Sequence, residues 1–109
     1  EFKKRATERA SHHRVELKIN LVGQGDAIRL SDKVIDTIET AAKELDLSYK
    51  RMYSGAVHDS AMMAGITDVG MIFVPSVGGR SHSPEELTHF EDLKAGCDIL
   101  LDTVLKLAR

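Results

Sequence analysis

The stretch from Gly70 to Glu86 places the strongest constraint on how this chain can fold. It begins with the apolar run Gly-Met-Ile-Phe-Val-Pro, residues 70–75, which lies between turn-forming residues. A short, continuous apolar run of this kind is typical of a strand that is buried on both faces. Pro75 ends the run, because proline has no N–H to give a neighbouring strand. The sequence therefore predicts a central strand of an α/β layer, with a loop at its carboxyl end.

The loop after this run is glycine-rich, and it contains a histidine just before the expected start of a helix. Gly78 and Gly79 are followed by Ser-His-Ser-Pro-Glu-Glu, residues 81–86. A serine, then a proline, then a glutamate is the order expected at a capped helix N-terminus. His82 would then lie just outside a helix start, at the carboxyl end of a strand. Open α/β sheets build their sites at that position.

The patterns on either side of the loop at 23–26 differ. Before it, residues 1–13 carry a thin apolar stripe typical of a helix, and residues 14–22 alternate like a strand with one buried face. After it, the pattern predicts helices at 31–45 and 58–64 and strands at 49–53 and 70–75. A last helix is expected to begin at a capping box formed by Thr88 and Glu91. Alternating helices and strands favour an α/β layer with parallel strands.

Composition narrows the possible classes of protein. The chain has 109 residues, enough for one domain at most. Its 15 basic and 17 acidic residues give a net charge of −2, and the basic residues do not gather on one face. This argues against nucleic acid as a partner. The single Cys97 excludes an internal disulfide and fits a reducing, cytoplasmic compartment. No apolar run approaches the ~20 residues of a membrane helix. Because the chain starts at Glu1 in charged helical sequence, we expect a piece of a longer protein.

Two histidines lie in settings that could support chemistry. His58 follows a Ser-Gly-Ala turn, and His82 follows the paired glycines. Neutral imidazole is the commonest metal ligand in proteins. A catalytic zinc, however, needs about three protein ligands, and no second ligand stands at a motif spacing from His82. A single histidine in a loop is more often a surface or hydrogen-bonding residue, and what favours a site at His82 is its long glycine-containing loop.

Three ordered motifs resemble the C-terminal part of a family of zinc-dependent amidohydrolases. They are Ser-Gly-Ala-Val-His-Asp-Ser (54–60), Gly-Met-Ile-Phe-Val-Pro-Ser (70–76) and Ser-His-Ser-Pro-Glu-Glu (81–86). The group includes N-carbamoyl-L-amino acid hydrolase, allantoate amidohydrolase, ureidoglycolate amidohydrolase and β-ureidopropionase, within the aminoacylase and carboxypeptidase superfamily. The resemblance covers residues 30–109 well and residues 1–22 more loosely.

The resemblance implies an α/β fold class, as a fragment of a two-domain metallohydrolase. Residues 1–25 would be the end of an α+β lid and dimerisation domain, and residues 26–109 the last part of the catalytic α/β domain. The intact enzyme would be a homodimer that holds two ions per site, zinc or manganese. We expect no metal on the fragment alone.

The resemblance also implies roles for particular residues. His82 matches the C-terminal metal-ligand histidine, and Val57 and His58 belong to a turn that contacts the substrate. Val57 departs from the family, which has glycine there; a β-branched residue disfavours positive φ and narrows the approach to the backbone. The other metal ligands, the glutamate base and the substrate-binding residues of the lid lie upstream in such enzymes. No catalytic residue is therefore expected within this chain.

The function that this resemblance implies is hydrolysis of non-peptide C–N bonds. In the intact enzyme a metal-activated water would attack the ureido or amide carbon of a small carboxylated substrate. The fragment alone is expected to be inactive, and neither nucleic acid nor a membrane is expected as a partner. The alternative is a non-catalytic interaction or dimerisation domain.

Overall fold

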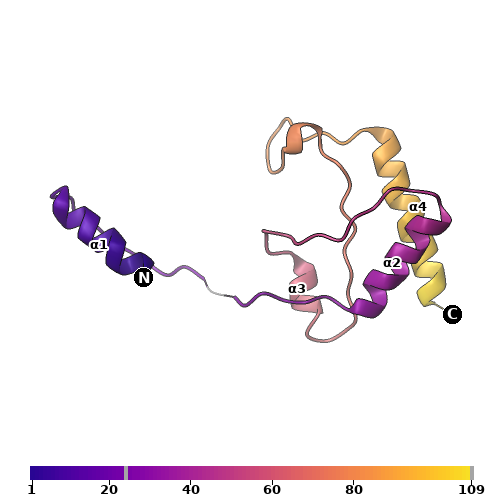
Figure 1. Ribbon diagram of the computed structural model, residues 1–109, viewed down its shortest axis with the longest axis horizontal. Coiled ribbons are helices and arrows are strands. Elements are labelled where there is room, and N and C mark those ends of the chain that lie inside the picture. The colour runs from indigo at the N-terminus through magenta and orange to yellow at the C-terminus, as the bar shows by residue number, and fades with distance from the viewer. Residues whose placement is uncertain (24, 109) are drawn as a thin grey trace.

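The computed structural model describes residues 1–23 and 25–108, and regular structure within them is helical (Figure 1). Its elements are the helices α1 (Phe2–His12), α2 (Asp32–Glu44), α3 (Asp59–Met63) and α4 (Phe90–Leu107), with the short 3-10 helix η1 (Val77–Gly79). No β-strand occurs in the described part of the chain.

The helices α2 and α4 pack against each other and hold the most deeply buried side chains. Ala41 and Ala42 on α2 are 0% and 1% exposed, and Thr103 on α4 is 3% exposed. Lys106 of α4 donates to the Glu44 carboxylate at 2.6 Å, which joins the C-terminal ends of the two helices. The core of the molecule therefore lies between these two helices.

The segment 69–75 lies against both of these helices. A Cβ built on Gly70 would be 2.5 Å from Val34 Cγ1 of α2, and a Cβ built on Gly96 of α4 would be 2.6 Å from Val74 Cγ1. Ordinary carbon atoms do not approach so closely, so glycine is what permits each contact. The segment that leads to the candidate site is therefore positioned by two close helix contacts.

The predicted strands over 14–22, 49–53 and 70–75 are wrong for the described residues. These segments are drawn as open, non-helical chain without neighbouring strands (Figure 1). A strand pairs its N–H and C=O groups with another strand, whereas a helix pairs them internally. Side chains that were expected to be buried are also open to solvent, because Leu21 is 72% exposed and Phe73 is 46% exposed. The described residues therefore do not form the α/β layer, although most of the predicted helices are present.

The helices over 1–13, 31–45 and 58–64 are confirmed within a residue or two by α1, α2 and α3. The helix predicted from Ser83 is wrong: Glu86 N–H donates to Ser83 C=O at 3.0 Å, which makes one turn that does not continue. After this turn the chain leaves the helical path, and the Leu87 carbonyl accepts from Val77 N–H at 2.8 Å. The capping box at Thr88 is also wrong, since α4 begins after His89, without a side-chain cap.

The molecule is elongated, with extents of 61 × 34 × 20 Å. The helix α1 lies apart from the others, and the described residues between it and α2 form no helix (Figure 1). The division into domains at residue 25 stays a prediction. Within the described residues, no helix combines the length and apolar character needed to cross a membrane.

Candidate functional site

The loop that carries His82 closes on itself at its base. Val77 N–H donates to the Leu87 carbonyl at 2.8 Å, which brings the two ends of the loop together. The paired glycines turn the chain just inside this closure, with φ values of +66° at Gly78 and +65° at Gly79. Glycine adopts this left-handed region without steric cost. The result is a compact surface loop of the Ω type, a class that is frequently functional.

His82 lies near the middle of this loop in an unusual backbone conformation. Its φ is +56°, in the left-handed region that few non-glycine residues occupy. The Glu86 carboxylate holds it there by accepting the His82 backbone N–H at 2.8 Å. The residue is exposed, so its imidazole is accessible from outside the loop. Strain of this kind persists where surrounding contacts maintain it, and it clusters at functional sites.

The second predicted site, the turn before α3, holds its histidine by two contacts. Ser54 Oγ lies 2.6 Å from His58 Nε2. The imidazole also meets the Phe73 ring edge-on, with centroids 5.7 Å apart and an interplanar angle of 67°. His58 is half-buried and caps α3 in an extended backbone conformation. Its ring is therefore oriented by Ser54 from one side and by the 70–75 segment from the other.

Val57 lies beside this histidine and is 87% exposed. Among the described non-glycine residues, positive φ occurs at Arg14, Asp46 and His82, and so not at Val57. The β-branched side chain therefore imposes no left-handed strain here. Val57 therefore differs from the family's glycine here by the bulk of its side chain on an open surface.

Both predicted sites adjoin the same segment, 70–75. The turn at 54–58 touches it through Phe73, and the loop at 77–87 leaves its carboxyl end. In Figure 1 both extend from the segment away from α4. The described residues contain no group of three or more His, Cys, Asp or Glu side chains that could hold a metal ion. His82 is therefore at most one ligand of a larger set.

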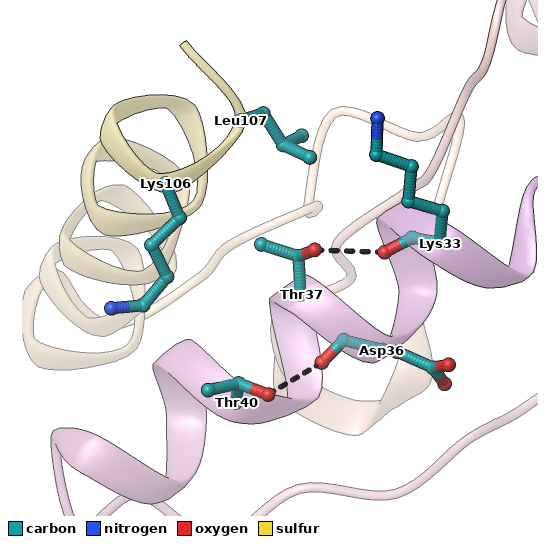
Figure 2. Close-up of a pocket in the computed structure, with 6 residues that line it drawn as sticks. All are labelled: Lys33, Asp36, Thr37, Thr40, Lys106 and Leu107. Atoms are coloured by element: carbon teal, nitrogen blue, oxygen red, sulfur yellow. Dashed lines mark hydrogen bonds between the residues drawn. The ribbon is translucent and has the colours of Figure 1, made fainter. Parts of the chain in front are cut away.

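A shallow cavity elsewhere lies between α2 and the end of α4 (Figure 2). It is lined by Lys33, Asp36, Thr37, Thr40, Lys106 and Leu107. The two threonine hydroxyls that face it donate at 2.8 Å to the helix carbonyls four residues earlier. None of the predicted site residues lines this cavity. The other polar side chains include Lys106, which pairs with Glu44, and Asp36, which pairs with Arg51, so the cavity walls are largely held in contacts between structural elements.

A polar cluster on α2 was not predicted from the sequence. The Glu39 carboxylate accepts from Lys43 at 2.6 Å, from Tyr49 at 3.1 Å and from Arg51 at 2.8 Å. The Lys43 ammonium, then Arg51 and Tyr49, lower the pKa of Glu39 to about 2 by hydrogen bonding to its charged form. The cluster ties the segment after α2 back onto the helix. Only the Glu39–Lys43 spacing of four was a signal in the sequence.

Ser54 and Glu86 contact His58 and His82, and neither contact was predicted from the sequence. Each stands four residues from the histidine that it contacts. A polar residue at that spacing across a glycine- or proline-containing turn is a signal for such a contact, although a weak one.

A model of the peptidase family M20/M25/M40 matches residues 7–106 of the chain. The chain belongs to this family. The resemblance predicted from the three motifs is thereby confirmed.

Named relatives of this M20 chain show how little of a whole protein it represents. It is 44% identical over 82 residues to the N-carbamoyl-L-amino-acid amidohydrolase of Paenarthrobacter aurescens, covering 75% of the chain and 20% of that protein. It is 44% identical over 100 residues to the ureidoglycolate hydrolase of Arabidopsis thaliana, covering 91% of the chain and 21% of that protein. The chain thus spans about a fifth of these relatives.

A solved structure, AtUAH in complex with glyoxylate, has a similar fold. It superposes on 96% of the chain and 25% of its own length, with a TM-score of 0.84 and 40% sequence identity. AtUAH in complex with (S)-hydroxyglycine matches to the same extent. The arrangement of helices and extended segments described above is therefore that of part of the M20 fold.

Proposed function

We propose that this chain is the C-terminal part of a metal-dependent hydrolase that cleaves non-peptide C–N bonds in N-carbamoyl or ureido acids. The observation that carries the proposal is the 44% identity to an N-carbamoyl-L-amino-acid amidohydrolase. Similarity to an allantoate amidohydrolase of Escherichia coli, 31% identical over 94 residues, points to the same class of substrate. The substrate is a small carboxylated molecule with a ureido or carbamoyl group.

His82 is the residue of this chain that would hold a metal ion. Its side chain fits the role, because the imidazole is exposed on a closed loop while its backbone N–H is fixed by Glu86. The bound ions, two per site and zinc or manganese, would activate water and polarise the carbonyl. The described residues supply no full ligand set, so other parts of the parent protein must provide the rest.

The turn at 54–58 would form one wall of the substrate pocket. Val57 presents an open surface there, and His58 presents a ring whose orientation Ser54 and Phe73 fix. These residues bind and orient the substrate in our proposal, and none of them transfers a proton. The general base and the remaining contacts lie outside this chain.

The further features of the parent follow the family. Residues 1–25 would end the lid domain, residues 26–109 would complete the catalytic domain, and the parent would act as a cytoplasmic homodimer. The position of α1, apart from the α2–α4 pair, supports this division (Figure 1). The competing function is a non-catalytic interaction or dimerisation domain.

The decisive experiment replaces His82 by Ala in the full-length parent protein. We expect lost metal and a fall in turnover of several orders of magnitude against N-carbamoyl and ureido acids. His89→Ala is the matched control, because that exposed histidine caps α4 without a side-chain hydrogen bond. Full metal occupancy and unchanged turnover in His82→Ala would show that the metal assignment is wrong. A parent protein without hydrolytic activity on any such acid would favour the interaction domain.

The 109-residue chain by itself should be inactive. It should also bind zinc no more tightly than a single exposed imidazole does. Calorimetric titration checks this, and a stoichiometric site with sub-micromolar affinity would contradict it.

A further inference from the structure

The Ser54 hydroxyl is the centre of three polar contacts within one turn. Its Oγ lies 3.2 Å from Ala56 N, 3.1 Å from Ala56 O and 2.6 Å from His58 Nε2. A serine hydroxyl has one hydrogen to donate and two lone pairs to accept with. The backbone N–H of Ala56 can only donate, and its carbonyl can only accept. These fixed roles limit how the histidine contact is made.

One arrangement of hydrogens uses all three contacts. Ser54 donates its hydrogen to the Ala56 carbonyl and accepts from Ala56 N–H with one lone pair. Its second lone pair then accepts from His58 Nε2, which must carry a hydrogen. In the opposite arrangement the hydroxyl donates to His58, and the contact with the Ala56 carbonyl is lost. The arrangement that satisfies more groups is the one with Nε2–H.

The neutral imidazole has one N–H, so a hydrogen on Nε2 leaves a lone pair on Nδ1. The edge-on contact with Phe73 restrains rotation of the imidazole ring about the bond that joins it to Cβ. The other ring nitrogen is therefore held in one direction as a hydrogen-bond acceptor. Ureido and carbamoyl groups present N–H donors, which are the complement of such an acceptor.

We propose that Ser54 is a positioning residue that fixes His58 as the Nε2–H tautomer, so that Nδ1 accepts a hydrogen bond from an N–H of a ureido or carbamoyl substrate. The tautomer assignment stands on the geometry of the turn alone. The step to the substrate rests on the proposed function. Selectivity for ureido and carbamoyl groups over esters would follow, because an ester offers no N–H at the corresponding atom.

Nitrogen NMR of the imidazole rings in the 109-residue chain tests the tautomer. At a pH where the imidazole is neutral, His58 should show a pyrrole-type Nε2 and a pyridine-type Nδ1. Ser54→Ala should move the chemical shifts of both His58 nitrogens toward those of the exposed His12 and His13, which average over the two tautomers. Ser54→Thr, which keeps the hydroxyl, should retain the pattern. Ser48→Ala, an exposed serine on another segment, is the control and should change nothing.

A pyridine-type Nε2 in the unmodified chain would overturn the assignment. So would an unchanged His58 spectrum in Ser54→Ala, or a loss of the pattern in Ser54→Thr while the backbone amide spectrum of α2 and α4 is preserved. A merely structural role of the hydroxyl would not move the tautomer.

Kinetics in the parent protein test the substrate step separately. Ser54→Ala should raise KM for N-carbamoyl acids about tenfold, with kcat and metal content little changed. If the tautomer is as assigned and KM does not change, the contact between this turn and substrate is disproved while the tautomer assignment stands.

Discussion

His82 combines a left-handed backbone with an accessible ring, and one carboxylate maintains that combination. Its φ of +56° costs free energy for a residue with a β-carbon. The Glu86 carboxylate offsets this cost by accepting the backbone N–H at 2.8 Å. The sequence pattern assigns this glutamate to a helix cap, but its carboxylate instead binds the residue before that expected helix.

Removal of this carboxylate should weaken metal binding in the parent protein without unfolding it. We expect Glu86→Ala to lower metal affinity roughly tenfold or more, the range seen when a group that orients a metal ligand is lost. Glu85→Ala, one residue earlier on the same exposed loop, is the control. Competition with a metal chelator measures both variants. Equal affinities for the two variants would show that Glu86 does not position His82.

Val57 provides a second prediction at the scale of a single residue. Its backbone is not left-handed, so Val57→Gly relieves no strain and should lower the free energy of unfolding by about 0.4–1 kcal/mol. In the parent protein, metal content should stay constant while KM or substrate preference shifts, as expected when a binding contact changes. Steady-state kinetics with several N-carbamoyl and ureido acids check this. An unchanged KM for all of them would place the turn away from the substrate.

The contact between α4 and the segment 69–75 depends on a glycine within a helix. Alanine at position 96 would gain up to ~1 kcal/mol in helix propensity. Its Cβ would, however, lie 2.6 Å from Val74 Cγ1, and overpacking of this kind typically costs ~1–3 kcal/mol. We therefore expect Gly96→Ala to lower the midpoint of urea unfolding.

Gly65→Ala is the matched control for this substitution. A Cβ at Gly65 would meet Met62 O at 3.6 Å, an ordinary van der Waals distance. Its unfolding midpoint should change little. A higher midpoint for Gly96→Ala than for the unmodified chain would contradict the close approach described here.

The Glu39 cluster makes the stability of the α2 region depend on pH. The pKa of Glu39 is lowered to about 2 from an ordinary value of 4.5, first by Lys43 and then by Arg51 and Tyr49. A carboxylate with a lowered pKa in the folded state contributes its stabilisation above the unfolded pKa. That contribution should therefore be complete above pH 4.5 and should fade as the pH falls toward about 2.

Urea unfolding of the chain at a series of pH values between 2 and 7 measures this dependence. Glu39→Gln should flatten the acid side of the curve, whereas Glu16→Gln, on the extended segment before α2, should leave it as it is. An acid slope that persists unchanged in Glu39→Gln would show that other carboxylates produce it.

Except for the helix expected at Ser83, the helices could be predicted from the sequence, and the strands could not. The apolar face of α2 ends in Ala41 and Ala42, and a helix needs only its own backbone and one such face to form. Residues 14–22 and 70–75 have strand-like patterns, but no partner strand in the described residues completes them. The motifs predicted that His58 begins a short helix, as it does at α3, whereas His82, expected between a strand and a helix, lies in a loop that has neither beside it. The motifs did not predict that Ser54 and Glu86 contact these histidines, because both contacts depend on the exact path of two loops.

The whole molecule is much less compact than a typical domain of its size. Its radius of gyration is 19.8 Å, against about 13 Å expected for a globular domain of this length. Large apolar side chains remain open to solvent, for example Val22 and Tyr53 at 98% and Ile66 at 80%. Apolar surface and unpaired backbone of this extent favour association with another chain.

We expect the isolated chain to associate with itself as its concentration rises. Light scattering across a concentration series measures this, and Val22→Lys should weaken it if the segment at 14–22 takes part. A strictly monomeric species at high concentration would contradict the prediction.

The backbone hydrogen bond from Val77 to Leu87 affects which insertions this part of the protein can accept during evolution. Because the loop begins and ends at nearly the same point, residues can be added between 78 and 86 without displacing α4. Doubling the length of a flexible loop costs only about 0.6 kcal/mol in closure entropy. The tip of the loop can therefore acquire new recognition elements by insertion while the helices behind it keep their packing, and the same eleven-residue unit, 77–87, is a natural piece to graft onto another scaffold.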